Sequence, residues 1–149
     1  REIPLVGISS LQALAVGAVN TREKGADARA VLAVIDARRG EAFVAAWHAV
    51  QRELEPRAVR PEALALEVGR LAAAHGAAPL AVGDGALRFR EQLEAAGADV
   101  PPSDSWLHLI SAIHHCRLAA GLPATAPAEV EPAYLRAPDA EIAYRERNR

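Results

Sequence analysis

The chain has 149 residues, of which 51% are hydrophobic and only 4% aromatic. A chain of this length buries about 70% of the surface that its unfolded form exposes, so it can form a core without disulfides or metals. The 17 basic and 19 acidic residues nearly balance, which argues against a domain that holds nucleic acid by electrostatics alone. The single cysteine excludes an internal disulfide framework, and a cytoplasmic location is the expectation.

The first predicted elements are a short strand and a helix. Residues 3–8 form an apolar run that is typical of a strand, and no run in the sequence reaches the roughly 20 residues that span a membrane. Ser10 is expected to cap the helix that follows, from Leu11 to about Val19. Residues 20–27 are predicted to be a polar loop.

Two apolar runs separated by a glycine predict an antiparallel hairpin. Val31–Ile35 is almost continuously apolar, as in a strand that is covered on both faces. The second strand is predicted at residues 41–50, and Gly40 allows the tight turn between the two. A short edge strand, interrupted by Pro56, is expected at residues 50–59.

Helices dominate the remainder. A helix is predicted from Pro61 to His75, because proline suits the first helical turn. A buried strand follows at residues 79–82, and then an amphipathic helix at residues 86–96.

A last long helix is predicted from Trp106 to about Ala120, with Ser103 or Asp104 as its cap. Residues 137–149 are expected to be a polar, disordered tail. This order of elements indicates an α/β domain with a mixed sheet flanked by helices. Its few large core side chains are expected to be Trp47, Trp106, Phe43 and Tyr134.

Three carboxylates, Asp36, Glu41 and Asp84, are candidates for a divalent-metal site of the kind found in RNase H-like nucleases. The other interpretation is that Asp36 pairs with Arg38 or Arg39 and fixes the hairpin turn. We favour the second, because a two-metal site needs more carboxylates at strand ends than this sequence offers.

Two other patterns are poor evidence of a phosphate-binding or metal-binding site. Gly83-Asp84-Gly85 lies between a strand and a helix, where amides can hold a phosphate, but the third glycine of a dinucleotide loop and the Lys-Ser/Thr pair of a P-loop are absent. A turn explains these glycines. His108, His114, His115 and Cys116 are wrongly spaced to share a metal ion, so a surface or core-edge location is expected. No catalytic residue and no cofactor are predicted.

Four blocks of the sequence, in order along the chain, resemble segments of the TsaB/YeaZ family. They are residues 4–15, with Pro-Leu-Val-Gly-Ile-Ser-Ser-Leu-Gln-Ala-Leu-Ala; residues 31–43, which contain Asp36-Ala37-Arg38-Arg39-Gly40-Glu41; residues 82–85, with Val-Gly-Asp-Gly; and residues 131–136, with Glu-Pro-Ala-Tyr-Leu-Arg. The second and fourth blocks are the most specific.

This resemblance implies an RNase H-like, actin-like (ASKHA-type) lobe over residues 1–136, the second of two lobes in the family, followed by the tail at 137–149. The family's first lobe, with its Asp-Thr-Ser strand start and Gly-Pro-Gly-Ser-Phe-Thr-Gly loop, is not in this sequence. The sequence also lacks methionine, so we expect a chain with a trimmed start or one cut from a longer protein. The residues expected to have structural or interaction roles are Asp36, Arg38, Gly40, Glu41, Gly83, Asp84, Gly85, Tyr134 and Arg136.

The function that the resemblance implies is that of a non-catalytic scaffold in the synthesis of N6-threonylcarbamoyladenosine in tRNA. Its implied partners are a TsaD-type catalytic subunit, a TsaE-type ATPase and a second copy, with tRNA contacted only indirectly and no membrane partner. Two alternatives remain: a metal-dependent nuclease or ATPase lobe that uses Asp36, Glu41 and Asp84, and a module fused to an acetyltransferase.

Overall fold

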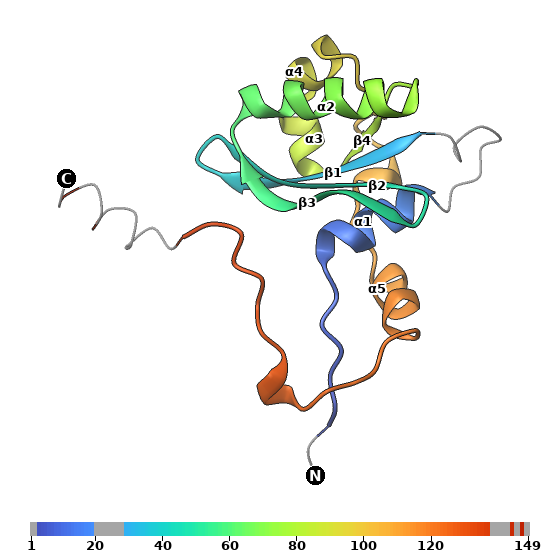
Figure 1. Cartoon of the computed structure of the whole chain (residues 1–149), viewed down its shortest axis with the longest axis vertical. Coiled ribbons are helices and arrows are strands. Elements are labelled where there is room, and N and C mark those ends of the chain that lie inside the picture. The colour runs from blue at the N-terminus through green and yellow to red at the C-terminus, as the bar shows by residue number, and fades with distance from the viewer. Residues whose placement is uncertain (1–2, 20–28, 138–143, 145–146, 148–149) are drawn as a thin grey trace.

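A computed structural model describes residues 3–19, 29–137, 144 and 147 of the chain, and these residues form a sheet with helices on both faces (Figure 1). The polar loop predicted at residues 20–27 lies outside the described residues, as does all of the tail predicted at 137–149 except residues 137, 144 and 147. No helix within the described ranges is long and apolar enough to cross a membrane.

The sheet has four strands in the order β3-β2-β1-β4. Their bounds are β1 (Ala30–Arg38), β2 (Glu41–His48), β3 (Gln51–Val59) and β4 (Leu80–Val82). The pairs β1–β2 and β2–β3 are antiparallel, whereas β4 runs parallel to β1, so the prediction of a mixed sheet is confirmed. Beyond β4, a single parallel bridge between Leu80 and Asp99 continues the pairing.

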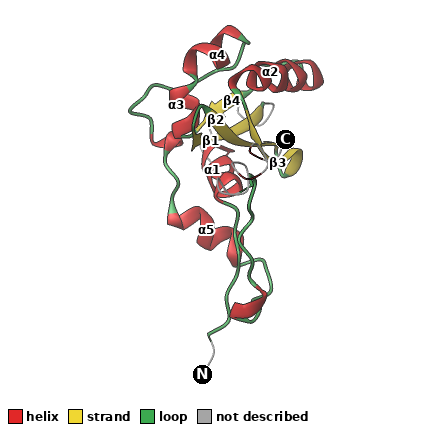
Figure 2. Ribbon diagram, turned by 90° about the vertical axis from the view of Figure 1, so that its left-hand side faces the viewer, coloured by secondary structure: helices red, strands yellow, loops and turns green. Residues whose placement is uncertain are grey.

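The unbroken apolar run in β1 is explained by the two layers that cover it. Leu32 and Val34 belong to a core shared with α2 (Pro61–His75) and α4 (Arg90–Ala95). Val31 and Ala33, which alternate with them, belong to a second core shared with α1 (Ser10–Val19). Figure 2 shows α2 and α4 on one side of the sheet and α1 on the other.

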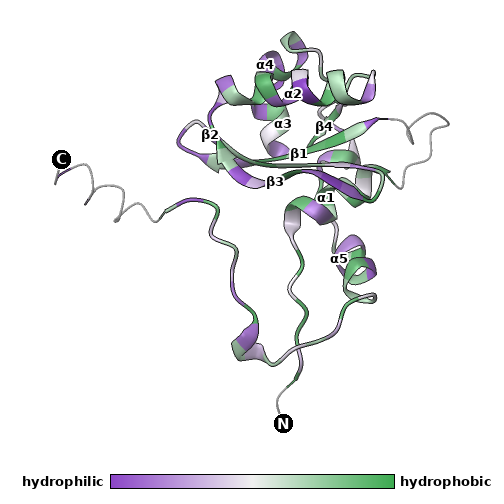
Figure 3. Cartoon of the chain, viewed as in Figure 1, coloured by the Kyte–Doolittle hydropathy of each residue, from purple (hydrophilic) through white to green (hydrophobic). Residues whose placement is uncertain are grey.

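The edge strand β3 is mostly polar, in contrast to β1 (Figure 3). Charged side chains and Pro56 on this strand discourage pairing with another chain, which protects the edge of the sheet. The strand spans all nine residues from Gln51 to Val59, so Pro56 does not end it.

The predicted bounds of α2 are confirmed, whereas the predicted cap of α1 is wrong. The helix α2 begins at Pro61 and ends at His75, as predicted, and Gly76 follows it in the left-handed conformation (φ 65°). The cap of α1 was assigned to Ser10, but the helix already begins there. Ser9 is the residue whose Oγ accepts a hydrogen bond from the amide of Gln12, at 3.4 Å.

Three other predicted elements differ from the structure. Residues 3–8 do not form a strand, because only Leu5 pairs, through two 2.9 Å backbone hydrogen bonds with Thr125. The helix predicted at 86–96 is divided at Phe89 into α3 (Asp84–Arg88) and α4. The long helix predicted from Trp106 is a short 3-10 turn, η2 (Trp106–His108), followed by α5 (Ala112–Ala119); another 3-10 turn, η3, spans Pro127–Glu129.

The prediction of one long helix was wrong, and the apolar stripe on which it was based is only partly buried. Trp106, Leu109, Ile110 and Ile113 are between 46% and 68% exposed. A stripe that is not fully buried stabilises a continuous helix only weakly, since most helical stability in proteins comes from packing. Trp106 is therefore not a core residue, nor is Tyr134, which is 81% exposed, whereas Trp47 is buried as predicted.

Candidate functional site

Most of the residues singled out in the sequence lie together at one end of the sheet, around the turn that joins β1 to β2. Arg39 and Gly40 form the two central residues of this turn, with φ values of 52° and 78°. Positive φ at both positions is the requirement of a type I′ hairpin turn. Arg38 also has a positive φ of 64°, and the register shifts between Asp36 and Arg38, which marks a bulge at the end of β1.

The Asp36 carboxylate holds this bulge in place. Its Oδ1 accepts a 2.9 Å hydrogen bond from the Arg38 amide, and its Oδ2 lies 2.9 Å from Nη1 of Arg88 and 3.5 Å from Nη1 of Arg38. Burial raises the pKa of Asp36, but the Arg38 amide and the two guanidinium groups outweigh this effect and keep the pKa below its ordinary value. Asp36 thus pairs with Arg38, as the turn-fixing interpretation predicted.

The Gly83-Asp84-Gly85 turn packs directly against β1. The Oδ1 of Asp84 accepts hydrogen bonds from the amides of Asp36, at 3.1 Å, and of Gly85, at 2.8 Å. A Cβ atom on Gly83 would lie 2.1 Å from the Val34 carbonyl oxygen, and one on Gly85 would lie 2.8 Å from the carbonyl carbon of Ile35. The glycines are therefore required by close backbone packing, and this supports the interpretation of a turn.

His108, whose role the sequence did not indicate, completes this turn. The His108 side chain is buried, with Nδ1 3.2 Å from the Gly83 amide and Nε2 3.1 Å from the Pro101 carbonyl oxygen. Nδ1 also lies 3.1 Å from the Gly83 carbonyl oxygen, so the ring connects the backbone of Gly83 to that of Pro101. His114 is also buried, against Gly17 of α1, so a surface location is wrong for these two histidines, whereas His115 is half-buried and Cys116 is exposed.

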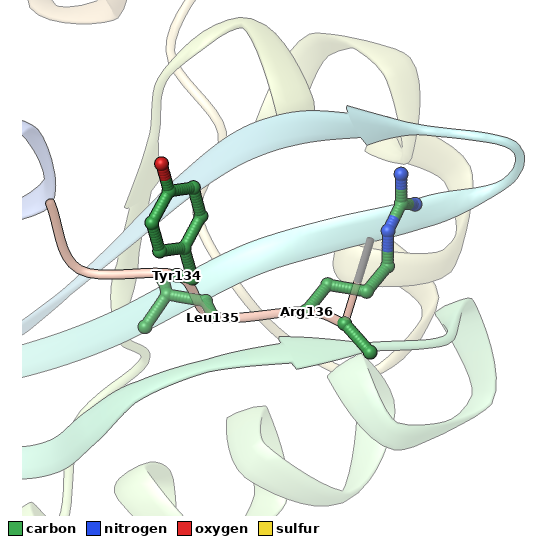
Figure 4. A pocket seen from close by; sticks show the side chains of 4 residues that line it. Tyr134, Leu135 and Arg136 are labelled. Carbon is green, nitrogen blue, oxygen red and sulfur yellow. The ribbon is translucent and has the colours of Figure 1, made fainter. Parts of the chain in front are cut away.

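The C-terminal segment returns to the same hairpin. Nη1 of Arg136 lies 3.2 Å from both the carboxylate of Glu41 and the carbonyl oxygen of Ala37, to which it donates hydrogen bonds. Figure 4 shows Arg136 on the side of the β1–β2 turn and Tyr134 farther from it. Tyr134, Leu135 and Arg136 line a shallow hollow of about 270 Å³. Leu135 packs against the α1 core, whereas the Tyr134 ring is exposed.

The contact between Arg136 and Glu41 is testable by a double-mutant cycle with Arg136→Ala and Glu41→Gln. Both side chains are about one quarter exposed, at 23% and 28%, so we expect a coupling energy of only about 0.5–1 kcal/mol. Urea unfolding of the parent, both single variants and the double variant measures it. Strictly additive effects would show that the two side chains do not stabilise each other.

The three candidate metal ligands are each engaged in a structural contact. Asp36 binds Arg38 and Arg88, Glu41 binds Arg136, and Asp84 binds backbone amides. Within the described part of the chain, no group of three or more His, Cys, Asp or Glu residues is arranged to hold a metal ion. The geometry of these residues thus gives the metal-dependent alternative no support.

Comparison with known proteins adds no family assignment. No protein-family model matches the sequence, and no curated protein matches it significantly. The resemblance described above therefore depends on the four sequence blocks.

Proposed function

We propose that this chain is the second lobe of a TsaB/YeaZ-type protein and acts as a non-catalytic scaffold in the threonylcarbamoylation of tRNA. One observation carries the proposal: blocks that bear the resemblance contact one another in space. The Asp36 amide donates to Asp84, 48 positions away, and Arg136 donates to Glu41, 95 positions away. Side chains that are already occupied by hydrogen bonds within the chain suit a structural role better than a catalytic one.

The arrangement of the sheet supports the RNase H-like, actin-like lobe that the resemblance implies. An antiparallel meander, β1–β2–β3, is followed across α2 by β4, which lies parallel to β1. The parallel bridge at Asp99 continues the sheet on the β4 side. Helices cover both faces, as the proposed lobe requires.

The proposed partners follow from the resemblance alone. They are a TsaD-type transferase, a TsaE-type ATPase and a second copy of the protein, with contact to tRNA only through the complex. Because the family's first lobe supplies most of the contact with the transferase, we expect the product of the complete gene to bind the TsaD-type subunit more tightly than this chain does.

Native mass spectrometry of the complete gene product mixed with the TsaD-type subunit tests this proposal. We expect a complex between the two, and an intact mass that exceeds the mass of this chain by a lobe of about 70–100 residues, a usual size for a small domain. The absence of a complex would contradict the scaffold role. Magnesium or manganese binding by the chain, measured by calorimetry, would instead favour a metal-dependent nuclease or ATPase lobe.

A further inference from the structure

We propose that the apolar stripe along η2 and the start of α5, formed by Trp106, Leu109, Ile110 and Ile113, binds the same stripe on a second copy of this chain. Each of these side chains is between 46% and 68% exposed, although all four lie within one short segment of the chain. Large apolar side chains that are grouped on a surface mark protein-binding sites. The inference does not depend on the proposed role in tRNA modification, since it uses only the surface of this chain.

The stripe lies where the chain leads away from the sheet. In both views, α5 lies on the far side of α1 from the sheet (Figures 1 and 2). On α5, the buried His114 packs against Gly17 of α1, whereas the neighbouring Ile113 is 52% exposed. The side of α5 that carries Ile113 is therefore covered only in part by the described residues, and it is accessible to a partner.

Opposite charges border the stripe. Asp104 and Arg117 are the only Asp, Glu, Lys or Arg residues between positions 104 and 117, and both are exposed. Arg117 follows Ile113 by one helical turn, so these two side chains are neighbours on the surface of α5. Neither Asp104 nor Arg117 forms an ion pair with another residue that the structure describes. An acidic group before the stripe and a basic group after it are thus both available to a partner.

This order of charges favours a second copy over an unrelated protein. In a dimer with two-fold symmetry the same surface faces itself, so residue i of one copy contacts residue j of the other, and j contacts i. Asp104 of each copy can then pair with Arg117 of the other, which gives two ion pairs. The apolar side chains between them pack together, with Trp106 as the expected anchor, because tryptophan is enriched among the residues that dominate binding energy. Like charges at both ends would instead make the stripe repel its own copy.

Sedimentation equilibrium of the chain, from about 1 μM to about 1 mM, tests the proposal. We expect the average mass to rise from 15.8 kDa towards twice that value as the concentration increases. Trp106→Ser should raise the dissociation constant of the dimer at least about tenfold. Asp104→Arg and Arg117→Asp should each raise it about fivefold. An equimolar mixture of these two charge-reversed chains should recover the parent affinity, because one copy then supplies two positive groups and the other two negative groups.

Two controls separate dimer formation from folding and from unspecific association. Both charge reversals are at exposed positions, so these variants should unfold at the same urea concentration as the parent. Leu66→Ser removes a 74% exposed apolar side chain from α2, on the other side of the sheet, and should leave the dissociation constant unchanged.

Three results would overturn the proposal: a chain that is monomeric at every concentration, a mixture of charge-reversed chains that does not recover affinity, or equal losses in Leu66→Ser and Trp106→Ser. A monomeric chain whose Trp106 is shielded from acrylamide quenching only in the proposed two-lobe protein would assign the stripe to the first lobe instead of a second copy.

Discussion

Replacing Gly83 by alanine is expected to destabilise the protein by about 4 kcal/mol, which combines a left-handed backbone with overpacking. Gly83 has a φ of 111°, and a Cβ there would lie 2.1 Å from the Val34 carbonyl oxygen and 2.7 Å from the Leu14 side chain. Neither β1 nor α1 can withdraw without opening a core. Because domains of this kind are stable by only about 5–15 kcal/mol, this loss would remove a large share of the free energy of unfolding.

Gly69→Ala is the matched control for this prediction. Gly69 lies inside α2 with no atom within 4 Å of a Cβ built on it, so alanine should stabilise the helix by about 0.5–1 kcal/mol. Urea unfolding midpoints measure both changes. Equal stability of the two variants would show that the turn at Gly83 does not pack against β1 as described.

Replacing Asp36 by alanine is expected to cost about 2 kcal/mol, because a mostly buried acceptor of charge-assisted hydrogen bonds is lost. The Asp36 side chain is 9% exposed, whereas the side chains of Arg38 and Arg88 are 81% and 46% exposed. Both arginines can turn to water in the variant. The loss therefore comes mainly from the Arg38 amide and the hairpin bulge, not from the ion pairs.

The same carboxylate has a predictable dependence on pH. The pKa of Asp36 is lower in the folded chain than its ordinary value, so its contribution to stability is present above that ordinary value. The contribution is lost as the pH falls through the folded pKa, below about 4. The difference in free energy of unfolding between the parent and Asp36→Asn should thus shrink between pH 5 and pH 2. Asp104→Asn, at an exposed loop position, is the control, and its difference from the parent should stay small at every pH. A difference that does not change with pH would contradict the assignment.

The central hairpin and α2 were predictable because local and tertiary preferences agree there. Val31–Ile35 is apolar on both faces, and the structure places a helical layer against each face. Gly40 lies at the turn where a positive φ is needed. Proline has no backbone N–H, and the first turn of a helix has no carbonyl partner for one. The start of α2 at Pro61 therefore follows from a local preference that does not depend on the rest of the fold.

The segment after Pro101 could not be predicted in the same way. Trp106, Leu109, Ile110 and Ile113 recur at helical spacing, but the described residues bury them only in part. His108, on the other side of this pattern, is buried between Gly83 and Pro101. Those two backbone partners are brought together by the parallel pairing of Asp99 beside β4, where Asp99 exchanges backbone hydrogen bonds with Pro79 and Ala81, and no local pattern encodes this pairing.

The candidate site was predictable as a set of residues and not as an arrangement. Asp36 and Arg38 are near each other in the sequence, so their pairing could be inferred. The contacts of Asp36 with Arg88, 52 positions away, and of Glu41 with Arg136 depend on the crossing of α3 and the C-terminal segment over the hairpin. The clash that requires Gly83 likewise exists only once β4 lies beside β1.

The most direct test of the scaffold role is the amount of N6-threonylcarbamoyladenosine formed on tRNA in a reconstituted reaction. The reaction contains the TsaD-type and TsaE-type subunits, ATP, and the threonylcarbamoyl donor, with or without the proposed two-lobe protein that has this chain as its second lobe. The scaffold role predicts that modification requires this protein and is retained when Asp84, one of the three metal-ligand candidates, is replaced by asparagine at a temperature where that variant is folded. Modification that proceeds equally without the protein would contradict it.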